Sequence, residues 1–227
     1  MVEILTPEQI LENFQKFTKF IENSFKGERQ EKLLKLVSDY EDRIALAPAS
    51  DNVGYHNAFP GGYVEHVMRV IEMAVNYYSY LKDTVGVEFL NNVTLEEVMF
   101  AALNHDLGKI GVGDEPYYEI NTSDWHVRNQ GKIYKKNNNL VHMSVPDRSV
   151  FLLNSYGISF SENEYLAIKI HDGLYDEANT GYFKQWNIDQ KQAINLAVIL
   201  HHADHVATMH EKAIYRKLLE EQIGYDK

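Results

Sequence analysis

The chain carries the run His105-Asp106-Leu107-Gly108-Lys109 at the end of a predicted helix. Thr94 and Glu97 form a capping-box pattern that opens this helix, and apolar residues follow at helical spacing. Adjacent His and Asp side chains near a helix end can both turn toward one ion, because they lie about 100° apart around the helix axis. Imidazole nitrogen and carboxylate oxygen together suit a hard or borderline divalent cation. The run therefore indicates metal ligation by His105 and Asp106.

Two other predicted helices carry the same residue types. His66 lies just inside the long helix that follows Gly61-Gly62, and Asp204 lies on the last long helix. A lone His-Asp pair often arises by chance or serves as a helix cap, but its joint occurrence with these motifs and with Lys109 favours a metal site. A bound ion with open positions lowers the pKa of its water toward about 7 and supplies hydroxide for attack on phosphorus. The residues are therefore suited to metal-assisted hydrolysis.

This arrangement resembles the HD superfamily, whose core pattern is a His, a His-Asp pair and a distant Asp, all on helices. The matching positions are His66, His105, Asp106 and Asp204. The resemblance implies an all-α fold, an HD-domain helical bundle, and a metal-dependent phosphohydrolase. Such an enzyme would hydrolyse a phosphomonoester, phosphodiester or phosphoanhydride of a nucleotide or short oligonucleotide. Asp106 and Lys109 would be catalytic, although Lys109 can also be a solvated cation at a helix end.

A narrower resemblance rests on Pro48-Ala49-Ser50, Tyr55-His56 and the double glycine. These segments are similar to the HD domain of YhaM-type exoribonucleases, of relaxase-associated HD proteins and of small phage-encoded HD hydrolases. In that branch two further histidines complete a two-metal site, and His142 and His171 occupy the matching places. The resemblance implies six ligands around two ions (Mn, Fe, Mg, Co or Ni), bridged by Asp106. Otherwise His142 is an exposed loop residue, His171 a helix cap, and a one-metal site remains.

Substrate contacts are expected from a small set of polar side chains: His56, Lys109, Arg128, Lys132 and Lys135. The last three belong to a locally basic and aromatic segment of an acidic chain. This segment can act as a lid that stacks a base and neutralises phosphates, or it can be a solvated hairpin. His56 lies in a turn, where a structural hydrogen bond is as good an interpretation as a contact with substrate phosphate.

The length of 227 residues suits one domain with decorations. We interpret 1–227 as a single HD-type domain, with N-terminal helices at 1–47, the HD core at 48–210 and a small β-hairpin insertion at 112–141. The remaining elements follow from capping patterns and apolar or alternating periodicity. They are a helix from Thr6-Pro7-Glu8-Gln9, a second from Gly27 to before Pro48, a hairpin across Trp125–Lys135, and helices near Pro146, at Ser161/Glu164 and from about Asp189 to Leu219.

Charge and composition narrow the choice of partner. The formal net charge of -11 disfavours duplex nucleic acid and leaves a small nucleotide or short oligonucleotide as the expected substrate. The chain has no cysteine, no signal-peptide pattern and no uncharged apolar run of about 18 residues, so we expect a cytoplasmic protein without a membrane anchor. The oligomeric state does not follow from the sequence.

Two other functions remain open. HD-like scaffolds can hold two irons for oxygen activation, which would make the chain a di-iron oxygenase. A retained scaffold can also serve as a non-catalytic nucleotide-binding module. Metal content and turnover distinguish these alternatives from phosphohydrolysis.

Overall fold

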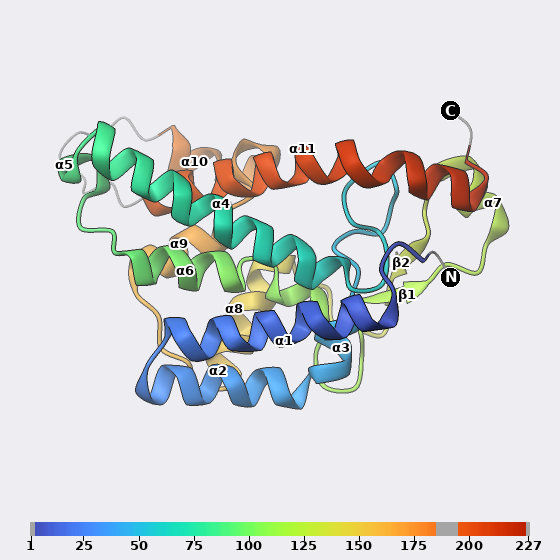
Figure 1. Ribbon diagram of the computed structural model, residues 1–227, viewed down its shortest axis with the longest axis horizontal. Helices are drawn as coiled ribbons and strands as arrows, with labels where there is room; N and C mark the ends of the chain where they lie inside the picture. The colour runs from blue at the N-terminus through green and yellow to red at the C-terminus, as the bar shows by residue number, and fades with distance from the viewer. Residues whose placement is uncertain (1–2, 185–194, 226–227) are drawn as a thin grey trace.

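A computed structural model describes residues 3–184 and 195–225 and confirms the predicted all-α bundle with a small β-hairpin (Figure 1). No helix in the described part of the chain has the length and apolar character needed to cross a lipid bilayer. The α-helices are α1 (Pro7–Ser24), α2 (Gly27–Asp39), α3 (Glu41–Leu46), α4 (Gly62–Thr84), α5 (Val87–Leu90), α6 (Leu95–Asn104), α7 (Asp124–Gln130), α8 (Val145–Ser155), α9 (Glu162–Lys169), α10 (Thr180–Phe183) and α11 (Asn195–Ile223). Short 3-10 helices are η1 (Leu107–Ile110), η2 (Gly173–Tyr175) and η3 (Glu177–Asn179).

Helix starts agree with the capping patterns. In each predicted capping box, the Thr or Ser side chain accepts a hydrogen bond from the backbone three residues later, and the Glu or Gln side chain accepts one from the cap backbone. These boxes are Thr6/Gln9 in α1, Thr94/Glu97 in α6 and Ser161/Glu164 in α9. The predicted second helix is divided at Tyr40, where α2 ends and α3 begins.

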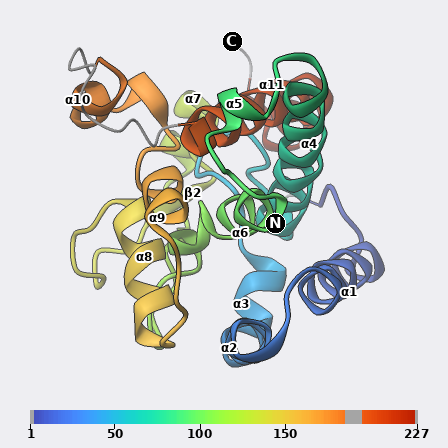
Figure 2. The same ribbon diagram turned by 90° about the vertical axis from the view of Figure 1, so that its left-hand side faces the viewer.

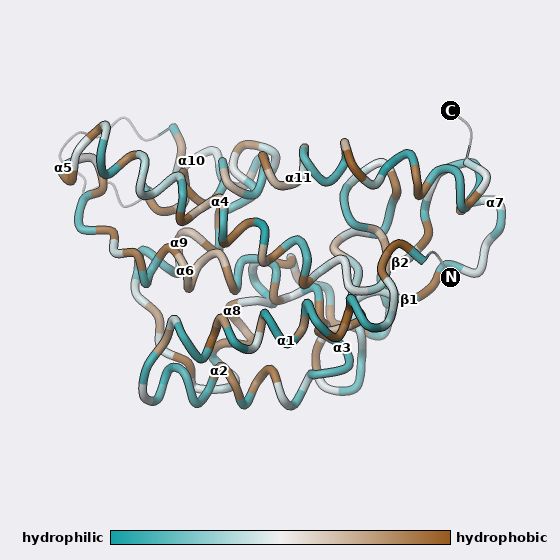
Figure 3. The backbone as a smooth tube through the Cα atoms, in the orientation of Figure 1, coloured by the Kyte–Doolittle hydropathy of each residue, from teal (hydrophilic) through white to brown (hydrophobic). Residues whose placement is uncertain are grey.

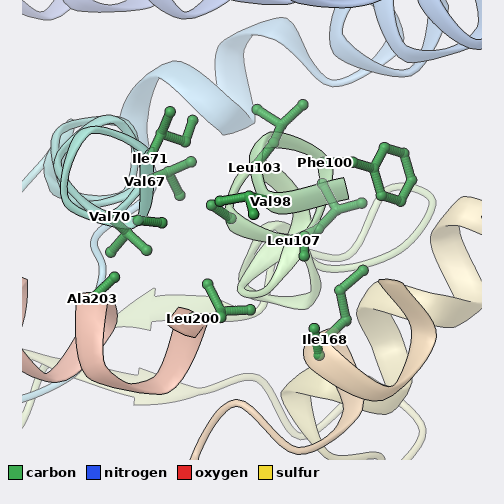
Figure 4. Close-up of a cluster of buried hydrophobic side chains, with 14 of the residues drawn as sticks. Val67, Val70, Ile71, Val98, Phe100, Leu103, Leu107, Ile168, Leu200 and Ala203 are labelled. Atoms are coloured by element: carbon green, nitrogen blue, oxygen red, sulfur yellow. The ribbon is translucent and has the colours of Figure 1, made fainter. Parts of the chain in front are cut away.

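The bundle is organised around α6, which lies between α4 and α11 on one side, α8 and α9 on a second and α1–α3 on a third (Figure 2). Hydrophilic and hydrophobic residues alternate along α1 and α2, as expected for helices with one buried face (Figure 3). In the core, α4, α6 and α11 contact one another through apolar side chains. Val67, Val70, Phe100, Leu103, Leu200 and Ala203 are among them, and Ile168 of α9 belongs to the same core (Figure 4).

The hairpin differs from its predicted position. Strand β1 (Tyr118–Ile120) pairs antiparallel with β2 (Tyr134–Lys136), and Tyr118 faces Lys136 in the register. The predicted location at Trp125–Lys135 was wrong, because most of that segment is helix α7 between the strands. Gly131 adopts a left-handed conformation (φ 66°) and its N–H bonds back to α7, so the Asn-Gln-Gly turn signal marks a helix end.

The last helix is described from Asn195 onward. The predicted start near Asp189 lies outside the described residues. The described part of α11 extends past the predicted end at Leu219 to Ile223. This extra turn places Ile223 against a small apolar cluster that includes Tyr134 of β2.

Candidate metal centre

Four helical elements bring candidate ligands to one point inside the bundle. His66 lies in the second turn of α4, and His105 caps the C-terminal end of α6. Asp106 precedes η1, His171 follows α9, and Asp204 lies within α11. These elements pack around α6 (Figure 2), so side chains that are far apart in the sequence converge.

The double glycine has a steric role at the start of α4. A Cβ on Gly62 would lie 2.2 Å from the carbonyl oxygen of Asn57, which is closer than any real contact. Gly61 has a φ of 84°, a conformation that favours glycine. The two glycines therefore let the chain of residues 57–61 fold back against the helix start and hold His66 next to this loop.

The ligand atoms are spaced for a shared cation. His66 Nε2 lies 3.2 Å from Asp204 Oδ1 and 3.6 Å from Asp106 Oδ2, and His105 Nε2 lies 3.5 Å from Asp106 Oδ2. His171 Nε2 is 3.7 Å from Asp106 Oδ1. Ligands about 2.1 Å from one ion lie about 3 Å from each other, so these separations suit coordination. Among the described residues, nothing hydrogen-bonds the buried Nε2 atoms of His66 and His105, which further fits a metal.

Each of these histidines engages its other ring nitrogen in a hydrogen bond. His105 Nδ1 lies 2.8 Å from the Ala102 carbonyl oxygen, and His171 Nδ1 lies 2.9 Å from that of Ile168. His66 Nδ1 lies 3.0 Å from Glu211 Oε2. Carbonyl and carboxylate oxygens only accept, so Nδ1 must carry the proton in each ring. The lone pair of each Nε2 is then free to bind a metal.

Sequence reasoning missed Glu211. This side chain is fully buried, and it lies seven residues after Asp204 on the same helix. That spacing places both carboxylates on one face of α11, so it could have indicated Glu211 from the sequence alone.

Charges in the centre keep the carboxylates ionised. Burial alone would raise the pKa of Asp106, but the cation of Lys109, 2.5 Å from Oδ2, and the neighbouring histidines lower it well below its usual range. Burial likewise opposes the charge on Lys109, yet Asp106 raises the pKa of this lysine. Burial lowers the pKa of His105 to about 4, so its imidazole is neutral near pH 7. Ionised carboxylates and a neutral imidazole are the forms that bind metal.

His66 has the opposite balance in the absence of an ion. Burial would lower its pKa, but the carboxylates of Glu211 and Asp204 raise the pKa of His66 to about 10. Metal binding at Nε2 would therefore displace a proton from this ring.

The centre opens into a cavity of about 620 Å³. His56, Lys109 and Asp204 lie in its wall on the side of the centre. Other residues also line this cavity: Lys136 and Lys212, and the rings of Tyr55, Tyr117, Tyr118 and Tyr175. In the described part of the chain neither Lys136 nor Lys212 has a carboxylate within ion-pair distance. Their charges are thus available to an anionic ligand.

The structure leaves several predicted site residues outside this centre. His142 is exposed in the loop between β2 and α8, and it joins none of the groups of possible metal ligands among the described residues. Arg128 lies 3.9 Å from Asp124, and Lys135 forms an ion pair with Glu119 across the hairpin. Lys132 is exposed. Arg128, Lys132 and Lys135 are not among the residues that line the cavity. For Lys135 the reason is strand alternation in β2, which places the neighbouring Lys136 on the cavity side.

His56 lies against the first predicted ligand. Its ring centre is 4.4 Å from that of His66, and its buried Nε2 has no hydrogen-bond partner among the described residues. Burial lowers the pKa of His56 well below its usual value, and the nearby charges of His66 and Lys109 lower it further. His56 is therefore neutral at pH 7 and can donate or accept a hydrogen bond at the cavity wall.

Comparison with known proteins gives one match. A family model described as HD domain matches residues 63–209, which include His66, His105, Asp106, His171 and Asp204. No curated protein and no solved structure matches the chain.

Proposed function

The chain belongs to the HD-domain family of metal-dependent phosphohydrolases, and from this premise we propose that it hydrolyses a phosphate ester or anhydride of a nucleotide or short oligonucleotide. One observation carries the proposal. Within residues 3–184 and 195–225, the buried Nε2 atoms of His66 and His105 have no hydrogen-bond partner, and they face the carboxylates of Asp106 and Asp204 at 3.2–3.6 Å. This donor set of imidazoles and carboxylates suits Mn, Fe, Mg, Co or Ni.

We propose two ions rather than one. The oxygens of Asp106 face different groups, because Oδ2 approaches His66 and His105 whereas Oδ1 approaches His171. A carboxylate with oxygens directed to two sides can bridge two ions. Five ligands are within reach of the pair: His66, His105, Asp106, His171 and Asp204. His142, the sixth ligand that the resemblance implied, is exposed and is not needed for this arrangement.

Divalent cations in such a site polarise phosphate oxygens and lower the pKa of a coordinated water. The protein contributes charge and orientation around them. Lys109 lies at the cavity wall, and Asp106 raises its pKa, so its cation can hold a phosphate oxygen and offset negative charge in the transition state. Asp106 orients Lys109 through their ion pair. His56 also lines the cavity, and its ring can hydrogen-bond a further phosphate oxygen.

Nucleotides fit the cavity in size and chemistry. A volume of about 620 Å³ lies in the usual range for small-molecule sites. The tyrosine rings offer stacking surfaces for a base, and Lys136 and Lys212 offer charges for additional phosphates. The net charge of -11 opposes the binding of long duplexes, so we propose a small nucleotide or a short single-stranded oligonucleotide as substrate.

A substrate panel tests the proposal directly. Metal-free protein is loaded with Mn²⁺, Mg²⁺, Co²⁺ or Ni²⁺ and incubated with nucleoside mono-, di- and triphosphates, cyclic nucleotides and short oligonucleotides. We expect release of phosphate or nucleoside from at least one class. Asp106→Ala should abolish turnover and metal binding, and Lys109→Met should lower kcat by about 100-fold with metal content retained.

The matched control is Lys82→Met, which removes an exposed lysine near the end of α4 and should leave turnover unchanged. Loaded wild-type protein that turns over no member of the panel would contradict the proposal. An iron content near two with oxygen uptake would instead identify a di-iron oxygenase, and tight binding of intact nucleotides without turnover would identify a binding module.

A further inference from the structure

Glu211 is a fully buried carboxylate that contacts His66 at Nδ1, whereas Asp106 and Asp204 face Nε2 of the same ring. Its Oε2 lies 3.0 Å from Nδ1 of His66, and its Oε1 lies 3.1 Å from Nε of Arg69. Each oxygen thus accepts from a different donor. Burying a carboxylate is costly unless it is paired, and here one partner is the arginine cation and the other is the imidazole of His66.

The position of His66 explains why an acidic side chain is present. His105 and His171 follow the ends of α6 and α9, where backbone carbonyls lack intrahelical donors, and each ring uses the carbonyl three residues earlier. His66 lies near the start of α4, where the unpaired backbone groups are N–H donors and the carbonyls are already bonded within the helix. An acceptor for its Nδ1–H must therefore come from another element.

We propose that Glu211 is the positioning residue for His66: it accepts the Nδ1 proton, fixes the tautomer and directs Nε2 toward the metal. The inference rests on metal binding by the centre, as proposed above. A carboxylate acceptor increases the basicity of a ligand histidine more than a neutral carbonyl does. His66 is then the strongest imidazole donor of the centre.

A second set of contacts holds Glu211 in place. Arg69 donates from Nη2 to Glu65 Oε1 at 2.9 Å, and the hydroxyl of Tyr215 donates to the same oxygen. These residues lie on α4 and α11, so the network joins the helix that carries His66 to the helix that carries Asp204. The carboxylate of Glu211 cannot rotate away from His66 without losing the bond to Arg69.

This geometry makes Glu211→Gln an informative variant. Glutamine has the same shape, but its amide has one acceptor oxygen and one NH₂ donor. The amide oxygen should turn to the arginine cation, which leaves the NH₂ facing His66 Nδ1. The ring would then accept at Nδ1 and carry its proton on Nε2, where it blocks metal binding. In the double variant Arg69→Met/Glu211→Gln, the amide oxygen is free to accept from His66, so the metal-binding tautomer should return.

The test is a titration of metal-free protein with Co²⁺, followed by visible absorption, together with thermal melting of each variant. We expect Glu211→Gln to bind Co²⁺ about 10–100-fold more weakly than wild type with an altered spectrum. The double variant should bind more tightly than Glu211→Gln. The matched control is Glu164→Gln, since Glu164 is also fully buried and pairs with Arg29 at 2.8 Å, away from the centre. It should change the melting temperature and leave Co²⁺ affinity unchanged.

The outcomes separate this inference from the proposed function. If wild-type protein binds no Co²⁺, the proposed function fails. If wild type binds and Glu211→Gln binds equally well, the inference fails, and a double variant that binds no better than Glu211→Gln overturns the tautomer argument. Nitrogen NMR of Zn²⁺-loaded wild type does not depend on the stability of any variant. We expect His66 to be protonated at Nδ1 and ligated at Nε2, and the reverse pattern would overturn the inference.

Discussion

At the scale of single residues, the centre depends on which nitrogen each histidine presents. His66, His105 and His171 all direct Nε2 inward, because an acceptor is available for each Nδ1 proton. His142 has no such support and is exposed to solvent. Coordination therefore requires both a ligand of the right type and a neighbour that sets its orientation.

The two histidines implied by resemblance should behave differently on substitution. His171→Ala removes a ring within 3.7 Å of Asp106 and should lower turnover by at least about 100-fold with loss of metal. His142→Ala should leave metal content and kcat unchanged, because this side chain lies outside the centre. Elemental analysis and kinetics of both variants check this prediction. A loss of metal from the His142 variant alone would restore it as a ligand.

At the scale of elements, the start of α4 depends on the absence of a side chain. Gly62→Ala would push a Cβ against the Asn57 carbonyl oxygen, where only 2.2 Å is available. We expect an unfolding free energy lower by about 1–3 kcal/mol, measured by urea denaturation. Metal affinity should fall too, because His66 would move with the helix start.

Gly181→Ala is the control for this variant, since a Cβ there meets no atom of the described residues within 4 Å. It should leave both stability and metal affinity close to wild type. Equal stability of the Gly62 and Gly181 variants would contradict the steric explanation.

Another element-scale feature is Glu97, which joins the starts of two helices. Its Oε2 accepts from the Thr94 backbone at 2.9 Å, and its Oε1 accepts from the Ser161 hydroxyl at 2.7 Å. Burial alone would raise the pKa of Glu97, but these hydrogen bonds outweigh it and lower the pKa. The carboxylate therefore stabilises the fold above the pKa of the unfolded chain, and this contribution is lost as the pH falls through the lower pKa of the folded state.

The corresponding prediction concerns acid stability. Glu97→Ala should lower the unfolding free energy by about 1 kcal/mol at pH 7, and its difference from wild type should shrink below about pH 4. Urea denaturation across this range measures the effect. Glu162→Ala, at an exposed position in the first turn of α9, should show no comparable pH-dependent difference. A difference for Glu97→Ala that is constant with pH would refute the role of its charge.

At the scale of the whole molecule, the ligands connect helices that are distant in sequence. His66, His105, His171 and Asp204 come from four separate parts of the bundle, so an ion at their common point would join α4, α6, α9 and α11. The carboxylates of Asp106 and Asp204 both lie near Nε2 of His66, and without cations they depend on neighbouring charges for compensation.

Metal removal should consequently destabilise the entire fold. An ion at 100 times its Kd stabilises the folded state by about 2.7 kcal/mol, so chelation should lower the Tm by about 5–10 °C in a domain of this size. Thermal melting with EDTA, and after addition of excess Co²⁺ or Mn²⁺, measures this change. The Asp106→Ala variant should show no response to either treatment. An identical Tm with and without metal in wild type would count against a shared site.

Local sequence patterns predicted most of the helices and the candidate ligands His66, His105, Asp106 and Asp204. Capping boxes at Thr6, Thr94 and Ser161 depend on groups within four residues, so they can be recognised in the sequence. The position of the hairpin was harder to predict, because the turn residues before Gly131 are equally compatible with the end of a short helix such as α7. Short elements with few internal hydrogen bonds depend on tertiary contacts for their form.

Periodicity, capping patterns and ligand chemistry are local properties, so the fold class, the capped helix starts and the candidate ligands could be predicted from the sequence. Which of the candidate residues lie together depends on the packing of distant segments. Glu211 reaches His66 across 145 residues of sequence, Lys136 and Lys212 line the cavity while Arg128 does not, and His142 stays outside. The physical reason is that convergence depends on how helices pack around α6, and packing is set by the sum of many apolar contacts between distant segments.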